Sequence, residues 1–185
     1  MACADFDGQV VRQDPEIAKL AQQFICVRIQ SMNGVNLNLF QFEYDLTWMG
    51  FFMDGKDRFY ARYGGRLDNN AESHLSQQSL ARVMRQVIDL HRAKAVQTSR
   101  YEPQGLTPRV PEQLPTIKAM LASRDNKCIH CHDVKVANLK HLQTLNRFRR
   151  DLVFTYPTPA NLGIAIDPDR QNLVIRITPD SPASQ

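Results

Sequence analysis

A five-residue run, Cys128-Ile129-His130-Cys131-His132, constrains this chain more than any other feature. Two cysteines three positions apart, followed at once by a histidine, must be presented together on one short stretch of backbone. This spacing is the attachment pattern of c-type haem, in which both thiols add to the vinyl groups of one porphyrin and the next histidine faces the iron. The run therefore predicts one covalent haem c, with Cys128 and Cys131 as thioether anchors and His132 as the proximal iron ligand.

Two other interpretations of the cysteine pair stay open. A zinc site needs about four ligands, and a second cysteine pair at finger-like spacing is missing, but His130 and His141 could complete a set. The two thiols could also form a simple disulfide or a redox pair. The haem interpretation is favoured over both, and within it His130 is a spacer that points to solvent or to a haem propionate.

The sixth ligand of the iron decides its chemistry, because a methionine raises the reduction potential whereas an absent ligand lets small molecules bind. No methionine follows the motif. His141 is the first candidate, although on one continuous helix it would lie ~13 Å from His132 along the axis, so that a shared iron requires a break. The other candidates are His91, Met120 and Met84, which also suit core positions. The remaining alternatives are a sixth position without a ligand and a ligand supplied by a partner protein.

Length and composition indicate a folded protein without a nucleic-acid surface. A chain of 185 residues allows one ordinary domain plus a smaller unit, and 43% hydrophobic residues suffice for a core. The net charge of +4 is modest. The basic residues Arg147, Arg149 and Arg150 form too short a cluster for nucleic acid. We interpret them as solvated surface, or as a docking patch for an acidic redox partner.

Covalent haem attachment takes place outside the cytoplasm, which predicts a periplasmic or otherwise exported protein. Neither a secretory signal nor a transmembrane stretch appears in the sequence: Met1 is followed by Ala2, Cys3 and Ala4 and then by the acidic residues Asp5 and Asp7. We therefore expect that the sequence lacks its true N-terminus.

Residue patterns predict an α/β chain in three consecutive parts, of which residues 1–95 are the first. A helix begins at Asp14-Pro15-Glu16, with proline at the first helical position. A buried strand follows over residues 24–29 and carries Cys26 as a small buried hydrophobe. A hairpin then turns at Asp54-Gly55. After Ser73 or Ser76 comes a helix with apolar residues at helical spacing, namely Leu80, Val83, Met84, Val87 and Ile88.

The second part, residues 96–152, combines a linker with a helical segment that carries the haem motif. Five Pro and Gly residues between Pro103 and Pro115 exclude long regular elements from its start. A short helix is expected around Ile117. A further helix follows the motif, with a stripe formed by Leu139, Leu142, Leu145 and Phe148.

Five short runs of the first part occur in an order shared with a known family. They extend from Asp14 to Ala18, Phe24 to Ile29, Phe42 to Thr47, Phe51 to Gly55 and Arg62 to Gly65. In this order they resemble a thioredoxin-like domain of the kind fused to other modules in exported planctomycete proteins. The resemblance implies an α/β series of helix, strand, helix, hairpin and helix.

Two departures from that family bear on activity. Thioredoxin chemistry needs a Cys-x-x-Cys pair at the start of the first long helix, where the thiol pKa is depressed. Cys3 falls in the place of the second cysteine, and the first has no counterpart. Leu46-Thr47 stands where the resemblance would have a cis-proline followed by threonine. The domain is therefore expected to be a scaffold without disulfide oxidoreductase activity.

The third part, residues 153–185, contains two strand-like runs, over residues 162–166 and 173–177, with an Asp-Pro-Asp turn between them. With Asn161 before the first run and Pro179 after the second, they resemble the start of a PDZ domain. A complete domain of that kind captures a peptide C-terminus by strand addition, but this part is too short for the whole fold. The alternative is a β-hairpin that packs on the haem segment.

These observations predict an exported c-type haem protein that serves electron transfer or redox sensing, with an unidentified redox protein as its partner. The alternative is an interaction protein in which the PDZ-like and thioredoxin-like parts recruit partners and a haem or zinc site is structural.

Overall fold

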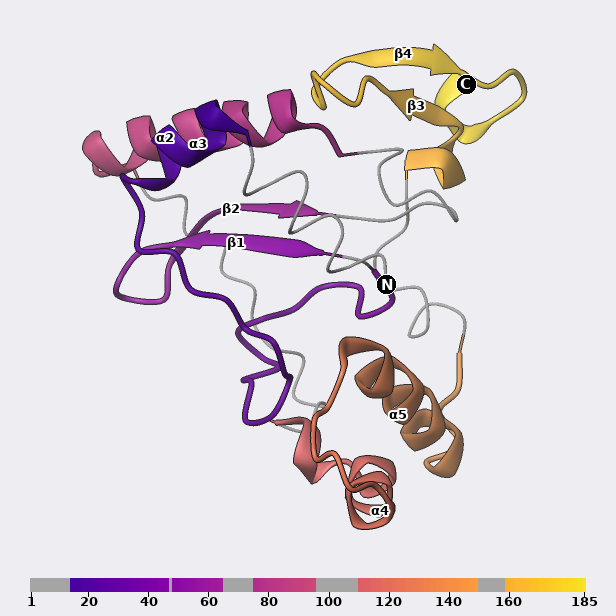
Figure 1. The fold of residues 1–185 in the computed structure, drawn as a ribbon. Helices are drawn as coiled ribbons and strands as arrows, with labels where there is room; N and C mark the ends of the chain where they lie inside the picture. The colour runs from indigo at the N-terminus through magenta and orange to yellow at the C-terminus, as the bar shows by residue number, and fades with distance from the viewer. Residues whose placement is uncertain (1–13, 47, 65–74, 96–109, 150–158) are drawn as a thin grey trace. The chain divides into compact units, whose positions relative to one another are not determined.

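The computed structural model describes residues 14–46, 48–64, 75–95, 110–149 and 159–185. Within them it has four α-helices and two small two-stranded antiparallel sheets, which confirms the mixed α/β class and identifies no specific fold. The chain forms two compact units (Figure 1), described one at a time below. The first comprises Met1–Cys26, Thr47–Ser99 and Pro157–Gln185, and the second comprises Val27–Leu46 and Arg100–Tyr156. This grouping differs from the division into three consecutive parts.

Helix α2, at Pro15–Ala21, begins where the sequence predicts it. The Asp14 carboxylate accepts a hydrogen bond of 2.8 Å from the Ile17 amide, which satisfies one of the donors that a helix start leaves unpaired. Pro15 occupies the first helical position, where its missing amide costs nothing. Ile17 is buried and brings α2 into the core of the first unit.

Strands β1 (Met49–Met53) and β2 (Phe59–Gly64) form the predicted hairpin. Its turn follows from the chemistry of Asp54, whose carboxylate accepts the backbone amides of Lys56 and Arg58. The Arg58 side chain donates to the same carboxylate at 2.8 Å. The hydrogen bond from the Arg58 side chain is the main cause that lowers the pKa of Asp54 to about 2. The Asp54-Gly55 turn prediction is therefore confirmed.

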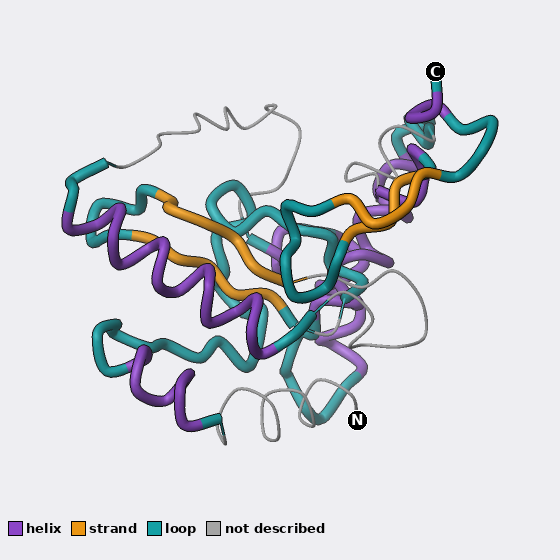
Figure 2. Tube along the Cα trace, turned by 90° about the horizontal axis from the view of Figure 1, so that it is seen from above, coloured by secondary structure: helices purple, strands orange, loops and turns teal. Residues whose placement is uncertain are grey.

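Helix α3, at Gln77–Arg92, starts after Ser76, one of the two serines after which the sequence predicts a helix. The Ser76 hydroxyl accepts the Ser79 amide at 3.0 Å as a helix cap. Figure 2 shows α3 running along the β1–β2 hairpin. Its inner face contributes to what we call the α3 core, made of Ile17, Tyr63, Leu75, Leu80, Ala81 and Met84, with Trp48 and Phe52 packed against it.

The predicted strand over residues 24–29 is wrong. The structure has irregular backbone there, and the side chain of Ile25 is 97% exposed. Cys26, predicted to be a buried hydrophobe, is also exposed. An apolar run becomes a buried strand only where another strand or helix covers it, and no described strand pairs with this run. Cys3 and Thr47, which the thioredoxin resemblance involved, lie outside the described residues.

The C-terminal hairpin pairs β3 (Ile164–Ile166) with β4 (Val174–Ile177) and confirms the two strands predicted there. The Asp167 carboxylate accepts the amides of Asp169 at 2.9 Å and Arg170 at 2.7 Å, which shapes the turn. All residues of β4 are exposed. None of the described helices is long and apolar enough to cross a membrane.

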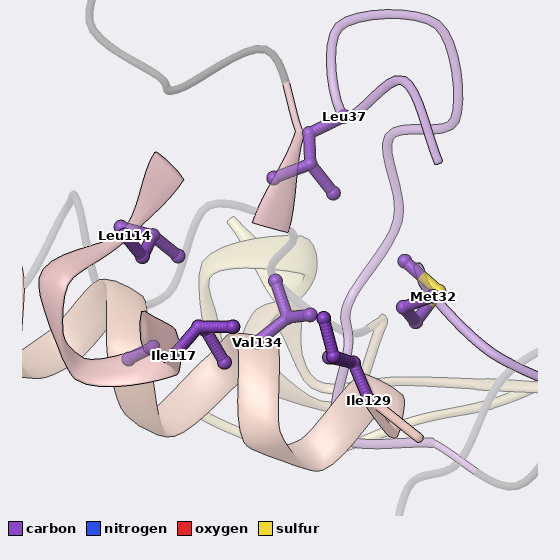
Figure 3. Packing of buried hydrophobic residues seen from close by; sticks show 7 residues of the cluster. Met32, Leu37, Leu114, Ile117, Ile129 and Val134 are labelled. Atoms are coloured by element: carbon purple, nitrogen blue, oxygen red, sulfur yellow. The ribbon is translucent and has the colours of Figure 1, made fainter. Parts of the chain in front are cut away.

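The second unit contains α4 (Pro115–Ser123) and α5 (Cys131–Thr144), packed together. Both helices were expected, but α5 ends at Thr144, so Leu145 and Phe148 fall beyond it and are exposed. Figure 3 shows buried residues of what we call the α4–α5 core. Its members are Met32, Leu37, Leu114, Ile117, Ile129, Val134 and Ala137.

Candidate functional site

The cysteine motif spans the start of helix α5. Cys128, Ile129 and His130 lie in the approach to the helix, Cys131 is its first residue, and His132 its second. Cys128 and Cys131 carry thiols and are partly exposed, whereas His130 and His132 are exposed. The helix boundary therefore divides the motif, with one cysteine on each side.

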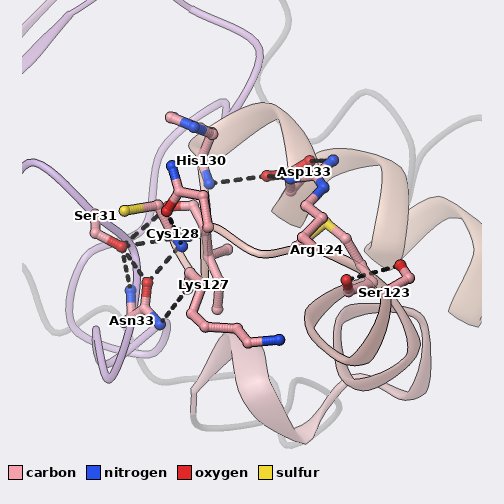
Figure 4. A network of polar contacts seen from close by, with 11 residues as sticks. Ser31, Asn33, Ser123, Arg124, Lys127, Cys128, His130 and Asp133 are labelled. Atoms are coloured by element: carbon pink, nitrogen blue, oxygen red, sulfur yellow. Dashed lines mark hydrogen bonds and ion pairs between the residues drawn. The ribbon is translucent and has the colours of Figure 1, made fainter.

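Ile129, between the two cysteines, anchors the motif to the protein. Its side chain is completely buried in the α4–α5 core. Its amide donates to Asn33 Oδ1 at 3.0 Å, and its carbonyl accepts the Met32 amide at 2.8 Å. Asn33 also donates to the Lys127 carbonyl, as Figure 4 shows. Because the middle residue is fixed on both sides, the flanking thiol and imidazole groups are held at the surface.

A second polar contact joins the start of α5 to Arg124, the residue that follows α4. The Asp133 carboxylate accepts the His130 amide at 2.9 Å and both terminal nitrogens of Arg124 at 3.1 and 3.2 Å (Figure 4). Partial burial acts to raise the pKa of Asp133, but the His130 amide and Arg124 outweigh it and hold that pKa below its ordinary value. An ionised Asp133 at the first turn also suits the positive end of the helix dipole.

Residues 43–46 run alongside the first turns of α5. Glu43 forms an ion pair of 2.7 Å with Lys135, and Asp45 Oδ1 lies 3.0 Å from His132 Nδ1. Further back along the helix, the Cys131 sulfur is 4.0 Å from the carbonyl oxygen of the buried Leu46. In the sequence this segment lies in the first predicted part, residues 1–95, yet in the structure it borders the cysteine motif.

Asp45 contacts one of the two ring nitrogens of His132. Its carboxylate engages Nδ1, so Nε2 is the ring nitrogen available to a metal. Sequence reasoning missed Asp45, Asn33 and Arg124. The only local indication of these contacts was Asp133, an acid in the first turn of a helix. Asp45 and Asn33 are distant from the motif in the sequence, and all three residues come to lie beside it only in the folded chain.

The structure argues against His141 as a second ligand to the same iron. Helix α5 runs unbroken from Cys131 to Thr144, and the break that a shared iron would require is absent from it. Nine residues of continuous helix place His141 ~13 Å along the axis from His132 and about half a turn round, on the opposite face. A single haem iron cannot bind both histidines in this conformation.

The other candidate ligands have structural contacts. Met120 is partly buried against the α4–α5 core, and Met84 is buried in the α3 core. His91 is exposed on α3, with Nδ1 at 2.8 Å from the Tyr60 hydroxyl. Both Met84 and His91 belong to the first unit, whereas the motif belongs to the second.

The zinc interpretation adds His130 and His141 to the two cysteines, and the docking interpretation uses the basic cluster at residues 147–150. Among described residues, no three His, Cys, Asp or Glu side chains are grouped so as to hold a metal ion. Of the basic cluster, Arg147 and Arg149 are exposed beyond the end of α5, and Arg150 lies outside the described residues.

An uncovered apolar residue lies beside His132 on the same helix face. Val136 is one turn further along α5 and is 49% exposed. Val134 and Ala137, on the inner face, are fully buried. A covalently held porphyrin requires two thiols, a ring nitrogen for the iron and adjacent apolar surface. Cys128, Cys131, His132 and Val136 supply groups of these kinds and therefore fit a haem.

Comparison with family models, with curated proteins and with solved structures finds no match to this chain. The chemistry of the site must therefore be argued from its own residues.

Proposed function

We propose that this chain is an exported c-type haem protein that serves electron transfer or redox sensing. Cys128 and Cys131 would hold one haem c through thioether bonds, and His132 would be the proximal iron ligand. The observation that carries the proposal is the contact of 3.0 Å between Asp45 Oδ1 and His132 Nδ1. It supports the proposal because it leaves Nε2 unengaged by that carboxylate, on the same short segment that carries both thiols.

Each part of the segment has a separate task in this proposal. Bound there, a haem would supply a one-electron couple between ferric and ferrous iron. The buried Ile129 holds the two cysteines in fixed positions on either side of it. The Arg124–Asp133 pair fixes the helix start that carries His132. Val136 would lose its contact with water beneath the porphyrin.

The remaining parts of the chain fit roles around that centre. The thioredoxin-like part, whose Cys-x-x-Cys is incomplete in this sequence, would be a scaffold rather than a disulfide oxidoreductase. An unidentified redox protein would exchange electrons with the haem. The sixth position would be open or filled by a residue other than His141.

A second candidate function is an interaction protein with a structural haem or zinc site. The observation that favours it is the β3–β4 hairpin, on which Leu173, Val174, Ile175 and Ile177 are exposed. A complete PDZ-like domain built on this hairpin would bind a peptide C-terminus by strand addition.

The test is production of the full chain in a bacterial host that expresses cytochrome c maturation enzymes. The purified protein should stay red after acid-acetone extraction, and its mass should rise by one haem. The variants Cys128→Ala and Cys131→Ala should each lose a thioether bond, which a pyridine haemochrome spectrum detects. Cys26→Ala is the matched control, since Cys26 is an exposed thiol outside the motif. A colourless product with one bound zinc per chain would favour the second candidate.

A further inference from the structure

A carboxylate from a distant part of the sequence contacts the histidine that the proposed function assigns to iron. Asp45 and His132 meet at 3.0 Å, and their side chains are 67% and 49% exposed. We propose that Asp45 is a positioning residue for the haem: it fixes the Nδ1–H form of His132, directs Nε2 to the iron and lowers the reduction potential. This inference rests on the proposed function and adds a tuning residue to it.

The effect on the potential follows from the hydrogen bond that the Asp45 carboxylate, 3.0 Å from His132 Nδ1, would accept from that nitrogen. A ligating histidine that donates its second N–H to a carboxylate is held in one tautomer and one ring orientation, and it becomes a more basic ligand. A more basic imidazole gives more electron density to iron. It therefore stabilises the ferric state relative to the ferrous state and lowers the potential, since hydrogen bonding around the axial ligand is one of the ways a protein tunes haem.

The surroundings of Asp45 hold its backbone in place. Its own amide donates to Glu43 Oε1 at 3.3 Å, and that carboxylate also pairs with Lys135 on α5. The next residue, Leu46, is buried. Asp45 is thus fixed from both sides along the chain while its side chain stays at the surface. Because exposed ion pairs contribute little to folding, variants at Asp45 should fold normally.

Glu43 offers a matched control. It carries the same charge as Asp45 two residues away, but its partner is Lys135 rather than His132. The variant Glu43→Gln removes that charge and still presents an oxygen to the Asp45 amide. A purely electrostatic effect on the haem would be similar for the two positions, whereas an effect through the His132 hydrogen bond would be specific to Asp45.

The experiment measures the midpoint potential of the haem-loaded protein by spectroelectrochemistry. The proteins compared are the unchanged chain and the variants Asp45→Ala, Asp45→Asn, Asp45→Glu and Glu43→Gln. Titrations at about 1 M salt, where the Debye length is about 3 Å, suppress the contribution of simple charge.

We expect Asp45→Ala to shift the ferric–ferrous equilibrium at least ten-fold toward ferrous iron, which is about 59 mV for one electron. Asp45→Asn should give a smaller shift, because a neutral amide oxygen is a weaker acceptor. Asp45→Glu should restore most of the original potential, and Glu43→Gln should leave it nearly unchanged. Equal shifts for Asp45→Ala and Glu43→Gln, or no shift for Asp45→Ala, would overturn the inference.

A second measurement on the haem-free protein separates this inference from the proposed function. Ring 15N chemical shifts, recorded where His132 is neutral, report which nitrogen carries the proton. The unchanged chain and Glu43→Gln should show the Nδ1–H form, and Asp45→Ala should lose that preference. An Nε2–H form in the unchanged chain would overturn the positioning role even if haem is attached. Failure to attach haem would instead overturn the proposed function, and with it the effect on the potential.

Discussion

Helix α3 is strongly amphipathic in sequence and helix α5 only weakly so, and the two use their surfaces differently. On α3 the apolar residues Leu80, Met84 and Val87 are all buried, and the exposed face is polar. On α5 only Val134 and Ala137 are buried, while Val136 lies exposed one turn from His132. The large apolar residues of α3 are buried or half-buried, whereas α5 leaves Val136 exposed near the cysteine motif.

In the proposed function, α3 is a helix with a structural role only, whereas α5 would carry the cofactor. Burial of apolar surface stabilises a helix, so an exposed valine contributes nothing to folding. Val136 lies near the two thiols and the His132 imidazole, and it would contribute to stability once a porphyrin covers it. The following predictions test whether that distinction between α3 and α5 is correct.

The largest expected effect is on the α3 core. Met84→Ala should lower the free energy of unfolding by about 2–5 kcal/mol, because it leaves a cavity in packed surroundings. The only tryptophan, Trp48, packs against this core, so its fluorescence during denaturation reports the loss. Val136→Ala in the haem-free protein should change the stability of α5 by no more than about 0.5 kcal/mol, measured by amide hydrogen exchange. Similar losses of stability for Met84→Ala and Val136→Ala would contradict the distinction between α3 and α5.

The next effect concerns the Asp133 contact that fixes the start of α5. Asp133→Asn should cost about 1–2 kcal/mol near neutral pH, since it removes charge-assisted hydrogen bonds from Arg124. The folded-state pKa of Asp133 is lowered, so its contribution is fully present above its unfolded pKa of about 3.9 and is lost as pH falls through the folded pKa.

Hydrogen exchange of α5 amides across this acidic range measures that dependence. The unchanged chain should lose protection as the pH falls, and Asp133→Asn should show a flatter profile. Asp125→Asn, which alters an exposed acid in the same α4–α5 connection, is the control and should keep the original profile. Parallel profiles for the unchanged chain and Asp133→Asn would show that Asp133 does not stabilise the helix start.

A smaller effect should appear at Val136 only after haem attachment. Val136→Ser should lower the stability of the haem-loaded protein by about 1 kcal/mol, the value of a partly buried valine, and leave the haem-free protein nearly unchanged. The measurement compares denaturation midpoints of both forms. Leu145→Ser, at an exposed leucine beyond the end of α5, should be neutral in both forms. Identical responses at Val136 with and without haem would mean that no porphyrin covers this face.

The smallest effect is expected at the surface of α3, where Arg85 forms an ion pair with Glu16 of α2 and both side chains are about half exposed. Glu16→Gln should cost less than about 1 kcal/mol, and the cost should fall with added salt. Thermal unfolding at low and high salt measures it. A loss as large as that of Met84→Ala would show that α3 depends on surface charge rather than on its core.

Local features of the structure could be predicted from the sequence, and features that depend on distant residues could not. The caps at Asp14 and Ser76 and the turn at Asp54 use side chains within a few residues of the backbone groups they bind. The run over residues 24–29 has the composition of a buried strand, but composition does not supply a covering partner. The motif predicts haem attachment from the sequence and stays a prediction, whereas the contact of Asp45 with His132 could be found only in the fold.

The anchoring of Ile129 has a consequence for the order of events as the chain folds. The Ser31 hydroxyl and the Ile129 carbonyl meet across a sequence separation of 98 residues, whereas the β1–β2 hairpin closes locally. Long-range closure is slower than hairpin formation. In the proposed function, a haem-attachment enzyme would meet both thiols on a segment that this closure has not yet fixed. Substitutions that accelerate closure would shorten this interval, and the yield of mature protein would then depend on folding speed.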